Sequence, residues 1–239
     1  MANLPIHNIL FLDVETVSQH PQYQNMPEQW QQLWNKKAEQ LLKNKENEDA
    51  ASIYDRAAIY AEFGKVICIS CGIINGYGDE KNITIKSFFG DDEKTILQEF
   101  AAMLQKWTVG EPKFLCAHNG KEFDFPYLCR RMTVHQIPLP TLLNISGKKP
   151  WEIQHYVTME LWKFGDFKSY TSLDLLANTL GIPTPKDDIN GSMVGTVYWK
   201  ENDLPRIARY CEKDVLTTAQ ILLRLQGESL IQEKNIQIK

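Results

Sequence analysis

The sequence predicts an α/β domain in which helices flank a mixed sheet. Short apolar runs rich in β-branched residues indicate buried strands at 7–15, 65–76, 81–89 and 113–119. Segments with apolar residues at helical spacing lie between and after these runs, most clearly at 204–225. A chain of 239 residues, 43% of them hydrophobic, is long enough to bury one such core, so we expect a single domain over 1–239 that carries an insertion.

The strands are expected to bring polar side chains to their carboxyl ends. The first run ends at Asp13 and Glu15, and strand alternation puts both acids on one face of the sheet. The second and third runs flank Asn75-Gly76, which favours a β-hairpin. The fourth run leads into a helix from about Asp124 to His135. The stretch 155–162 fits either a strand or a helix, and we expect a mixed sheet of five strands.

Two helices are marked by their caps. Asp92 offers an N-cap to a helix that runs to about Trp107. The segment after residue 168 is a clearer helix, with Ser169 or Thr171 as the cap and Gly181 at the C-terminal stop.

The last long helix begins at Asp203 and Pro205, after a loop that contains prolines. Its apolar positions recur at helical spacing, at 208, 211, 215, 219 and 222. A tail over 227–239, which can be flexible, follows this helix.

A helical insertion of about 20–62 separates the first strand from the hairpin. Its apolar stripe begins after Pro27 and comprises Trp30, Leu33, Trp34, Leu41 and Leu42. Such a stripe ordinarily packs on a core. Because the insertion leaves the chain directly after Glu15, the alternative is a lid or wall beside the end of the first strand.

The composition limits the classes of function. A net charge of −4 argues against a protein that grips long duplexes by counterion release, although a cleft that binds divalent cations can still hold one strand end. No run approaches the roughly 18 apolar residues of a membrane-spanning helix. The N-terminus carries no basic leader, and the five cysteines suit a reducing compartment, so we expect a cytoplasmic protein without a membrane partner. Cys68 and Cys71 have a redox-like spacing, but they lie in a strand-like run and are interpreted as packing.

Each candidate site residue also has a structural interpretation. Asp124 alone can be a helix cap. Tyr210 and Asp214 are four residues apart on a predicted helix and therefore share one face. On such a face, a tyrosine that packs at the edge of the core and an acid that pairs with a neighbouring base are common. Asp13 and Glu15 are harder to explain in this way, because two carboxylates at the end of a buried strand are costly without a cation. The bases Lys121, Arg130 and Arg131 are expected to be solvated helix-face charges.

Taken together, three motifs resemble the DEDD superfamily of 3′-5′ exonucleases. They read Asp13-Val-Glu15, then Asn119-Gly-Lys-Glu-Phe-Asp124, then Tyr210-Cys-Glu-Lys-Asp214. The third motif is that of the tyrosine subclass, because the histidine subclass needs His at the position that Arg209 occupies. The segments FGKVICIS, SLDLLANTLGIP and PKDDINGSMV look most like stand-alone relatives of the proofreading domain of family-B DNA polymerases. The long insertion departs from the family pattern.

The resemblance implies a ribonuclease H-like fold and two divalent metal ions, Mg²⁺ or Mn²⁺. Asp13 would bridge both ions, Glu15 and Asp214 would complete the first ion site, and Asp124 would hold the second. Tyr210 would orient the attacking water, because a group with a pKa near 10 is a poor base at neutral pH. Thr16, Asn119 and Phe123 would contact the nucleic acid, Phe123 by stacking.

The implied activity is hydrolysis of phosphodiester bonds from the 3′ end of DNA, at single-stranded or frayed ends, with release of nucleoside 5′-monophosphates. A partner protein in DNA repair or replication is compatible with it. The alternatives are an RNA 3′-5′ exonuclease, since nothing in the motifs reads a 2′-hydroxyl, and a catalytically silent nucleic-acid-binding module. The intact acids and Tyr210 count against the silent module.

Overall fold

Six strands form one mixed sheet in the order β5-β4-β1-β2-β3-β6 in the computed structural model, which describes residues 4–43, 48–166, 168–183 and 189–239. The strands are β1 (Ile9–Ser18), β2 (Gly64–Asn75), β3 (Asn82–Phe89), β4 (Phe114–Ala117), β5 (Tyr156–Val157) and β6 (Ile236–Ile238). β1 is antiparallel to β2 and parallel to β4, and β2 is antiparallel to β3 as the predicted hairpin requires. The α/β ribonuclease H-like prediction is confirmed, with one strand more than the five expected.

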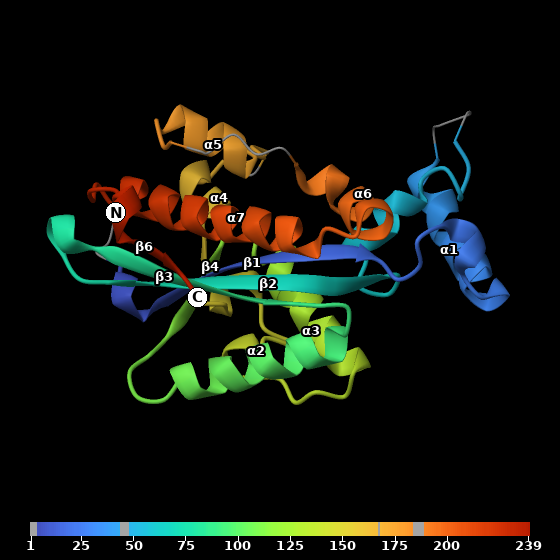
Figure 1. Cartoon of the computed structure of the whole chain (residues 1–239), viewed down its shortest axis with the longest axis horizontal. Helices are drawn as coiled ribbons and strands as arrows, with labels where there is room; N and C mark the ends of the chain where they lie inside the picture. Colours follow the sequence, from blue (N-terminus) through green and yellow to red (C-terminus); the bar gives the residue numbers. More distant parts are fainter. Residues whose placement is uncertain (1–3, 44–47, 167, 184–188) are drawn as a thin grey trace.

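Helices cover both faces of the sheet (Figure 1). On one face lies α7 (Leu204–Leu225), with α4 (Thr158–Lys163) in contact with it and α5 (Leu173–Thr179) on its outer side; on the other lie α2 (Glu93–Trp107) and α3 (Asp124–Val134). β1 divides its side chains between the two layers. Leu10, Leu12 and Val14 join the core under α2 and α3, whereas Ile9 and Phe11 pack with residues of α7. Every apolar position predicted on the last helix is buried.

The insertion lies at the end of the sheet where β1 ends. It contains α1 (Glu28–Leu41) and a 3₁₀ helix, Tyr54–Ile59, and Figure 1 shows α1 at one end of the molecule, beyond α6 (Val194–Thr196). The insertion has a small core of its own around Trp34, whose ring is fully buried among aromatic rings that include Tyr54 and Phe63. Trp34, Leu41 and Leu42 of the predicted stripe therefore pack in this core, whereas Trp30 and Leu33 are exposed.

Several details differ from the sequence-based expectations. The ambiguous stretch 155–162 is both kinds of structure, because the two-residue strand β5 passes directly into α4. The cap of α5 is Ser172, whose hydroxyl accepts a hydrogen bond from the Leu175 N–H, and not Ser169 or Thr171. Within the tail 227–239, β6 pairs with β3 as an added parallel strand. Residues 185–188 of the PKDDINGSMV segment lie outside the described residues.

Arg131 is buried, contrary to the expectation of a solvated charge. Its guanidinium donates to both carboxylate oxygens of Glu93, at 2.8 and 2.6 Å, and to the Ala61 carbonyl at 2.8 Å. Glu93 also accepts from the Val66 N–H at 2.7 Å and contacts His135 Nε2 at 2.6 Å. This network ties α2 and α3 to the start of β2. Lys121 pairs with Glu160 at 2.8 Å, and Arg130 is exposed as expected.

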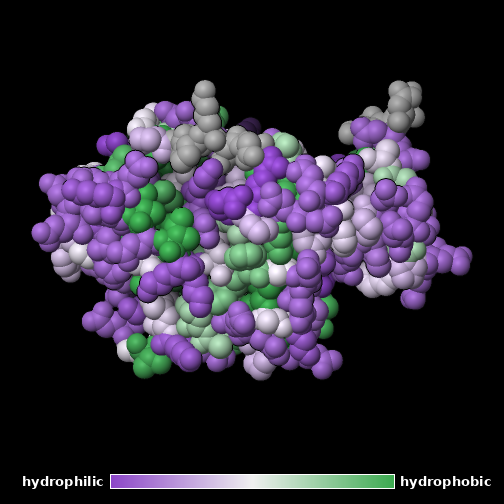
Figure 2. Space-filling model, in the orientation of Figure 1, coloured by the Kyte–Doolittle hydropathy of each residue, from purple (hydrophilic) through white to green (hydrophobic). Residues whose placement is uncertain are grey.

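The surface is mainly hydrophilic on the face that Figure 2 shows, with hydrophobic residues in small separate groups. Among the described residues, no helix combines the length and the apolar character needed to cross a membrane. All five cysteines are free thiols, and Cys68 and Cys71 are both buried in β2, in agreement with a packing role.

Candidate active site

The first two candidate residues follow from the alternation of β1. Ile9 and Phe11 point toward α7, and Asp13 and Glu15 continue the same row of side chains toward the carboxyl end of the strand. β4 pairs only with Ile9–Phe11, so beyond Phe11 this edge of β1 is not covered by β4. The two carboxylates therefore lie beneath the first half of α7, beside an open strand edge.

Helix α7 brings the third motif over these acids. Its N-cap is Asp203, whose carboxylate accepts from the Arg206 N–H at 3.1 Å. Tyr210 and Asp214 flank the buried stripe, and their side chains are hydrogen-bonded to each other. Between them, the Cys211 thiol donates to the Asp13 carbonyl at 3.4 Å.

Cys211 is a neighbour of the site that the motif reading missed. Its sulfur and one carboxylate oxygen each of Asp13 and Glu15 all lie within 4.8 Å of one another. Its position in the sequence could have pointed to it, because Cys211 directly follows Tyr210 and lies on the helix face that packs on the sheet.

The second motif is a turn between β4 and α3 that delivers Asp124. Gly120 is required in this turn, because a Cβ there would lie 2.4 Å from the Phe125 ring. His118, which comes just before this turn, is held in place through its ring nitrogens: one lies 2.8 Å from the Thr158 hydroxyl and the other 2.8 Å from the Thr171 carbonyl. Asp124 is the first residue of α3, not its N-cap, and its carboxylate accepts from its own N–H and from the Val14 N–H. This last bond ties Asp124 to the open edge of β1.

The acids raise one another's pKa. Burial and the charges of Asp214 and Asp124 raise the pKa of Asp13 well above its usual value, and burial and the charges of Asp13 and Asp214 do the same for Glu15. Burial raises the pKa of Asp124 to about 7, despite the two backbone hydrogen bonds. Burial and the charges of Asp214, Glu15 and Asp13 also raise the pKa of Tyr210. The sequence-predicted acids and Tyr210 thus form one electrostatically coupled cluster.

This cluster fits divalent cations. The Oδ2 atom of Asp13 is buried and, among the described residues, has no hydrogen-bond partner. Glu15 is 8% exposed and Asp124 is 5% exposed, so neither carboxylate is well solvated. Oxygen donors of this kind are those that Mg²⁺ and Mn²⁺ prefer, and a cation among them would relieve the repulsion that raises their pKa values.

Of the three expected nucleic-acid contacts, Thr16 and Phe123 lie in the lining of the cavity beside Glu15, and Asn119 does not. Thr16 follows Glu15, and its hydroxyl donates to the Ala58 carbonyl of the insertion at 2.9 Å. The Asn119 Oδ1 atom is buried and, within the described part of the chain, accepts no hydrogen bond. Phe123 is half-buried, with its ring 5.3 Å from that of Tyr127. Thr16 and Phe123 line the same cavity as Glu15.

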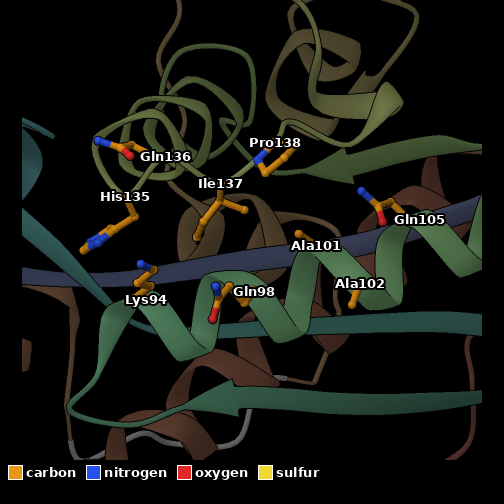
Figure 3. A pocket seen from close by; sticks show the side chains of 9 residues that line it. All are labelled: Lys94, Gln98, Ala101, Ala102, Gln105, His135, Gln136, Ile137 and Pro138. Atoms are coloured by element: carbon orange, nitrogen blue, oxygen red, sulfur yellow. The ribbon is translucent and has the colours of Figure 1, made fainter.

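That cavity, of about 540 Å³, opens beside Glu15 between β1, the insertion and residues 191–200. A second hollow of about 400 Å³ lies between α2 and residues 135–138, on the face of the sheet opposite α7 (Figure 3). Its lining includes Lys94, Gln98 and His135 but no carboxylate. The cavity beside Glu15 is therefore the one that adjoins the acidic cluster.

Comparison with known proteins identifies two archaeal DNA polymerases that are similar in sequence to this chain. The chain is 23% identical to a DNA polymerase of Thermococcus sp. (strain GE8) over 76% of this chain and 12% of that protein. It is 24% identical to a DNA polymerase of Archaeoglobus fulgidus over 67% of this chain and 23% of that protein. The chain thus spans a quarter or less of the length of these relatives.

A family-level match covers residues 59–235, which include Asp124, Tyr210 and Asp214 but begin after Asp13 and Glu15. The matching family is described as a predicted 3′-5′ exonuclease related to the exonuclease domain of PolB. Because the match extends over most of the chain, the protein belongs to this family of predicted 3′-5′ exonucleases.

Proposed function

We propose that the protein is a metal-dependent 3′-5′ exonuclease that acts on unpaired 3′ ends of DNA and releases nucleoside 5′-monophosphates. The observation that carries this proposal is the cluster of Asp13, Glu15, Asp124 and Asp214, in which a buried oxygen of Asp13 has no partner among the described residues. The family match supports the reaction class, and the two relatives named as DNA polymerases favour DNA over RNA.

In this proposal the carboxylates hold two divalent ions, Mg²⁺ or Mn²⁺. When bound, such ions lower the pKa of a water molecule and stabilise a departing 3′ oxygen. Asp13 would contribute to both ion sites, and the influence of the Asp214 and Asp124 charges on its pKa supports this role. Glu15 and Asp214 would complete the first site, and Asp124 would hold the second.

Tyr210 acts as a hydrogen-bond donor in this mechanism. Burial and three neighbouring carboxylates raise its pKa, so the phenol stays protonated at neutral pH and cannot serve as a general base. Its hydroxyl, close to Asp214, can instead orient the attacking water.

The test uses 5′-labelled single-stranded DNA, recessed duplex DNA and matched RNA, each with Mg²⁺ or Mn²⁺. We expect the wild-type protein to shorten DNA from the 3′ end, and Asp13→Ala and Asp214→Ala to lose more than about a hundredfold in rate. Asp79→Ala is the control, because Asp79 is exposed beside the hairpin turn. A 3′ ladder that persists in both site variants would reject the site, and faster digestion of RNA would favour the RNA alternative.

A further inference from the structure

The cavity beside Glu15 has walls from segments far apart in the sequence. β1 supplies Val14, Glu15, Thr16 and Ser18, the start of α3 supplies Phe123, and a third wall comes from residues within 191–200. The insertion supplies the fourth wall through residues 21–22 and 55–59. None of the residues of α1 that the structure describes is part of this lining, so α1 supports the wall from behind.

The insertion wall is fixed to the rest of the domain. The Ala58 carbonyl accepts hydrogen bonds from the Thr16 hydroxyl at 2.9 Å and the Tyr127 hydroxyl at 2.8 Å. Close approach at this point requires Gly64, because a Cβ there would lie 2.7 Å from the same carbonyl. Three residues further along the insertion, the Ala61 carbonyl accepts a hydrogen bond from the Arg131 guanidinium. These contacts indicate a rigid wall and not a lid that closes over the cleft.

The chemistry of the lining suits a nucleotide. Ile59 is 50% exposed on the insertion wall, and Phe123 and Trp199 offer aromatic surface on other walls. Such surfaces stack against or pack on bases without reading their sequence. The indole Nε1 of Trp199 is buried and has no partner among the described residues, which leaves a donor for a polar group.

Two exposed cations, Arg56 on the insertion wall and Lys200 on the wall formed by residues 191–200, line the cavity. A turn of π-helix, Val197–Glu201, carries Trp199 and Lys200 to the lining while it buries Tyr198. In a chain with a net charge of −4, two cations on different walls of a cavity that also offers aromatic and aliphatic surface suit a phosphate-bearing ligand. Asp55 also lines the cavity, and its charge would repel a phosphate, which leaves Arg56 as the phosphate contact on this wall.

We propose that segment 55–59 of the insertion is a wall of the pocket for the 3′-terminal nucleotides, with Arg56 on a strand phosphate and Ile59 against a base. This inference rests on the proposed exonuclease function. A wall fixed by Thr16 and Tyr127 cannot retreat, so the cavity admits one strand and excludes its paired complement. The insertion thereby makes the protein selective for unpaired 3′ ends.

The experiment compares KM, kcat and binding by fluorescence anisotropy for an unpaired DNA strand and for the same strand in a blunt duplex. We expect Arg56→Gln to raise KM and Kd for the unpaired strand about tenfold with kcat within about twofold, as for loss of one charged hydrogen bond. Ile59→Ser should raise KM severalfold. The matched controls are Arg224→Gln and Val109→Ser, both at exposed positions outside the cavity.

Gly195→Trp tests occupancy of the cavity directly. Gly195 lines the cavity and a Cβ there meets no atom within 4 Å, so a side chain at this position starts in open space, and an indole is large enough to occupy part of the cavity. We expect Gly195→Trp to lose cleavage and binding of the strand at an unchanged melting temperature, whereas Gly195→Ala keeps both.

Three results would overturn the inference: wild-type KM and Kd in both Arg56→Gln and Ile59→Ser, full activity of Gly195→Trp, or equal wild-type rates on the unpaired strand and the blunt duplex. Failure of the exonuclease proposal is a separate result, in which the wild-type protein shortens no strand from its 3′ end.

Discussion

At the scale of single residues, the site consists of ordinary side chains whose properties are changed by burial among like charges. Tyr210 shows this most clearly, because its phenol is only half-buried and yet lies close to the carboxylates of Asp214, Glu15 and Asp13. These negative charges disfavour the phenolate, so the hydroxyl remains a donor across the pH range in which the protein would work.

We therefore expect Tyr210→Phe to lower kcat about tenfold to a hundredfold while metal binding changes little. The aromatic ring keeps its packing, and only the hydrogen bond is lost. Rapid-quench cleavage gives the rate, and isothermal titration with Mn²⁺ gives the metal affinity. An unchanged rate at saturating metal would remove the role proposed for this hydroxyl.

The raised pKa of Asp124, about 7, predicts a pH dependence of stability in the absence of metal. The folded-state pKa exceeds the unfolded value, so the stability associated with the protonated group is present below pH 4 and is lost as pH rises through about 7. Asp124→Asn removes this titration. Relative to the wild-type protein, the variant should gain up to about 4 kcal/mol between about pH 4 and pH 8, measured by urea denaturation in EDTA.

Saturating metal should reverse the order of stability of these two proteins. With saturating Mn²⁺ at pH 8, the wild-type protein should become more stable than Asp124→Asn, because the ion binds only the intact carboxylate set of the folded state. If the free energies of unfolding of the two proteins changed in parallel with pH in EDTA, Asp124 would have an ordinary pKa and this prediction would be wrong.

At the scale of elements, the strands and helices that the sequence predicted well are those with a clear apolar periodicity or a recognisable turn. The hairpin and the final helix were predicted close to their observed bounds, because each has a strong local pattern, whereas the first strand, predicted over 7–15, continues beyond Glu15 to Ser18. β5 was ambiguous, since two residues are too few to show a period of two. The residues assigned to the motifs lie together, but the cavity beside Glu15 could not be predicted, because its walls come from distant segments that no local pattern connects.

The buried ion pair of Arg131 with Glu93 is a second feature that local patterns do not show, since its partners are 38 residues apart. Burial alone would raise the pKa of Glu93, but hydrogen bonds from Arg131, the Val66 N–H and His135 outweigh it and lower the pKa. The stability that Glu93 contributes is therefore present at neutral pH and is lost as pH falls through its lowered folded-state pKa.

We expect Arg131→Met to destabilise the protein by about 3–5 kcal/mol at neutral pH, because it leaves the Glu93 carboxylate buried without its main partner. The neighbouring Arg130 is exposed, so Arg130→Met is a matched control that should change the free energy of unfolding by less than about 0.5 kcal/mol. Urea denaturation measures both. Equal effects of the two substitutions would contradict a structural role for the buried pair.

At the scale of the whole molecule, the C-terminal segment closes the sheet edge that β3 would otherwise leave open. β6 pairs with Ile83–Ile85 of β3. Before it, Ile231 is buried, and its N–H and carbonyl both bond to the Gln220 side chain of α7 at 2.9 Å. Glu228 pairs at 2.8 Å with Lys81, which is only 4% exposed. These contacts join α7 to β3 through a segment that composition alone left as a tail.

Two C-terminal truncations distinguish the contribution of β6 to stability from that of the contacts made by residues 227–235. Removal of residues 236–239 deletes a short, mostly exposed strand and should cost about 1 kcal/mol or less. Removal of 227–239 also exposes the core around Ile231, leaves the Gln220 amide unpaired and strips the buried Lys81 ammonium of its acid, so a loss of about 3 kcal/mol or more is expected. Chemical denaturation gives both values, and Glu228→Gln isolates the ion pair. If the segment were a flexible tail, both truncations would leave the free energy of unfolding unchanged.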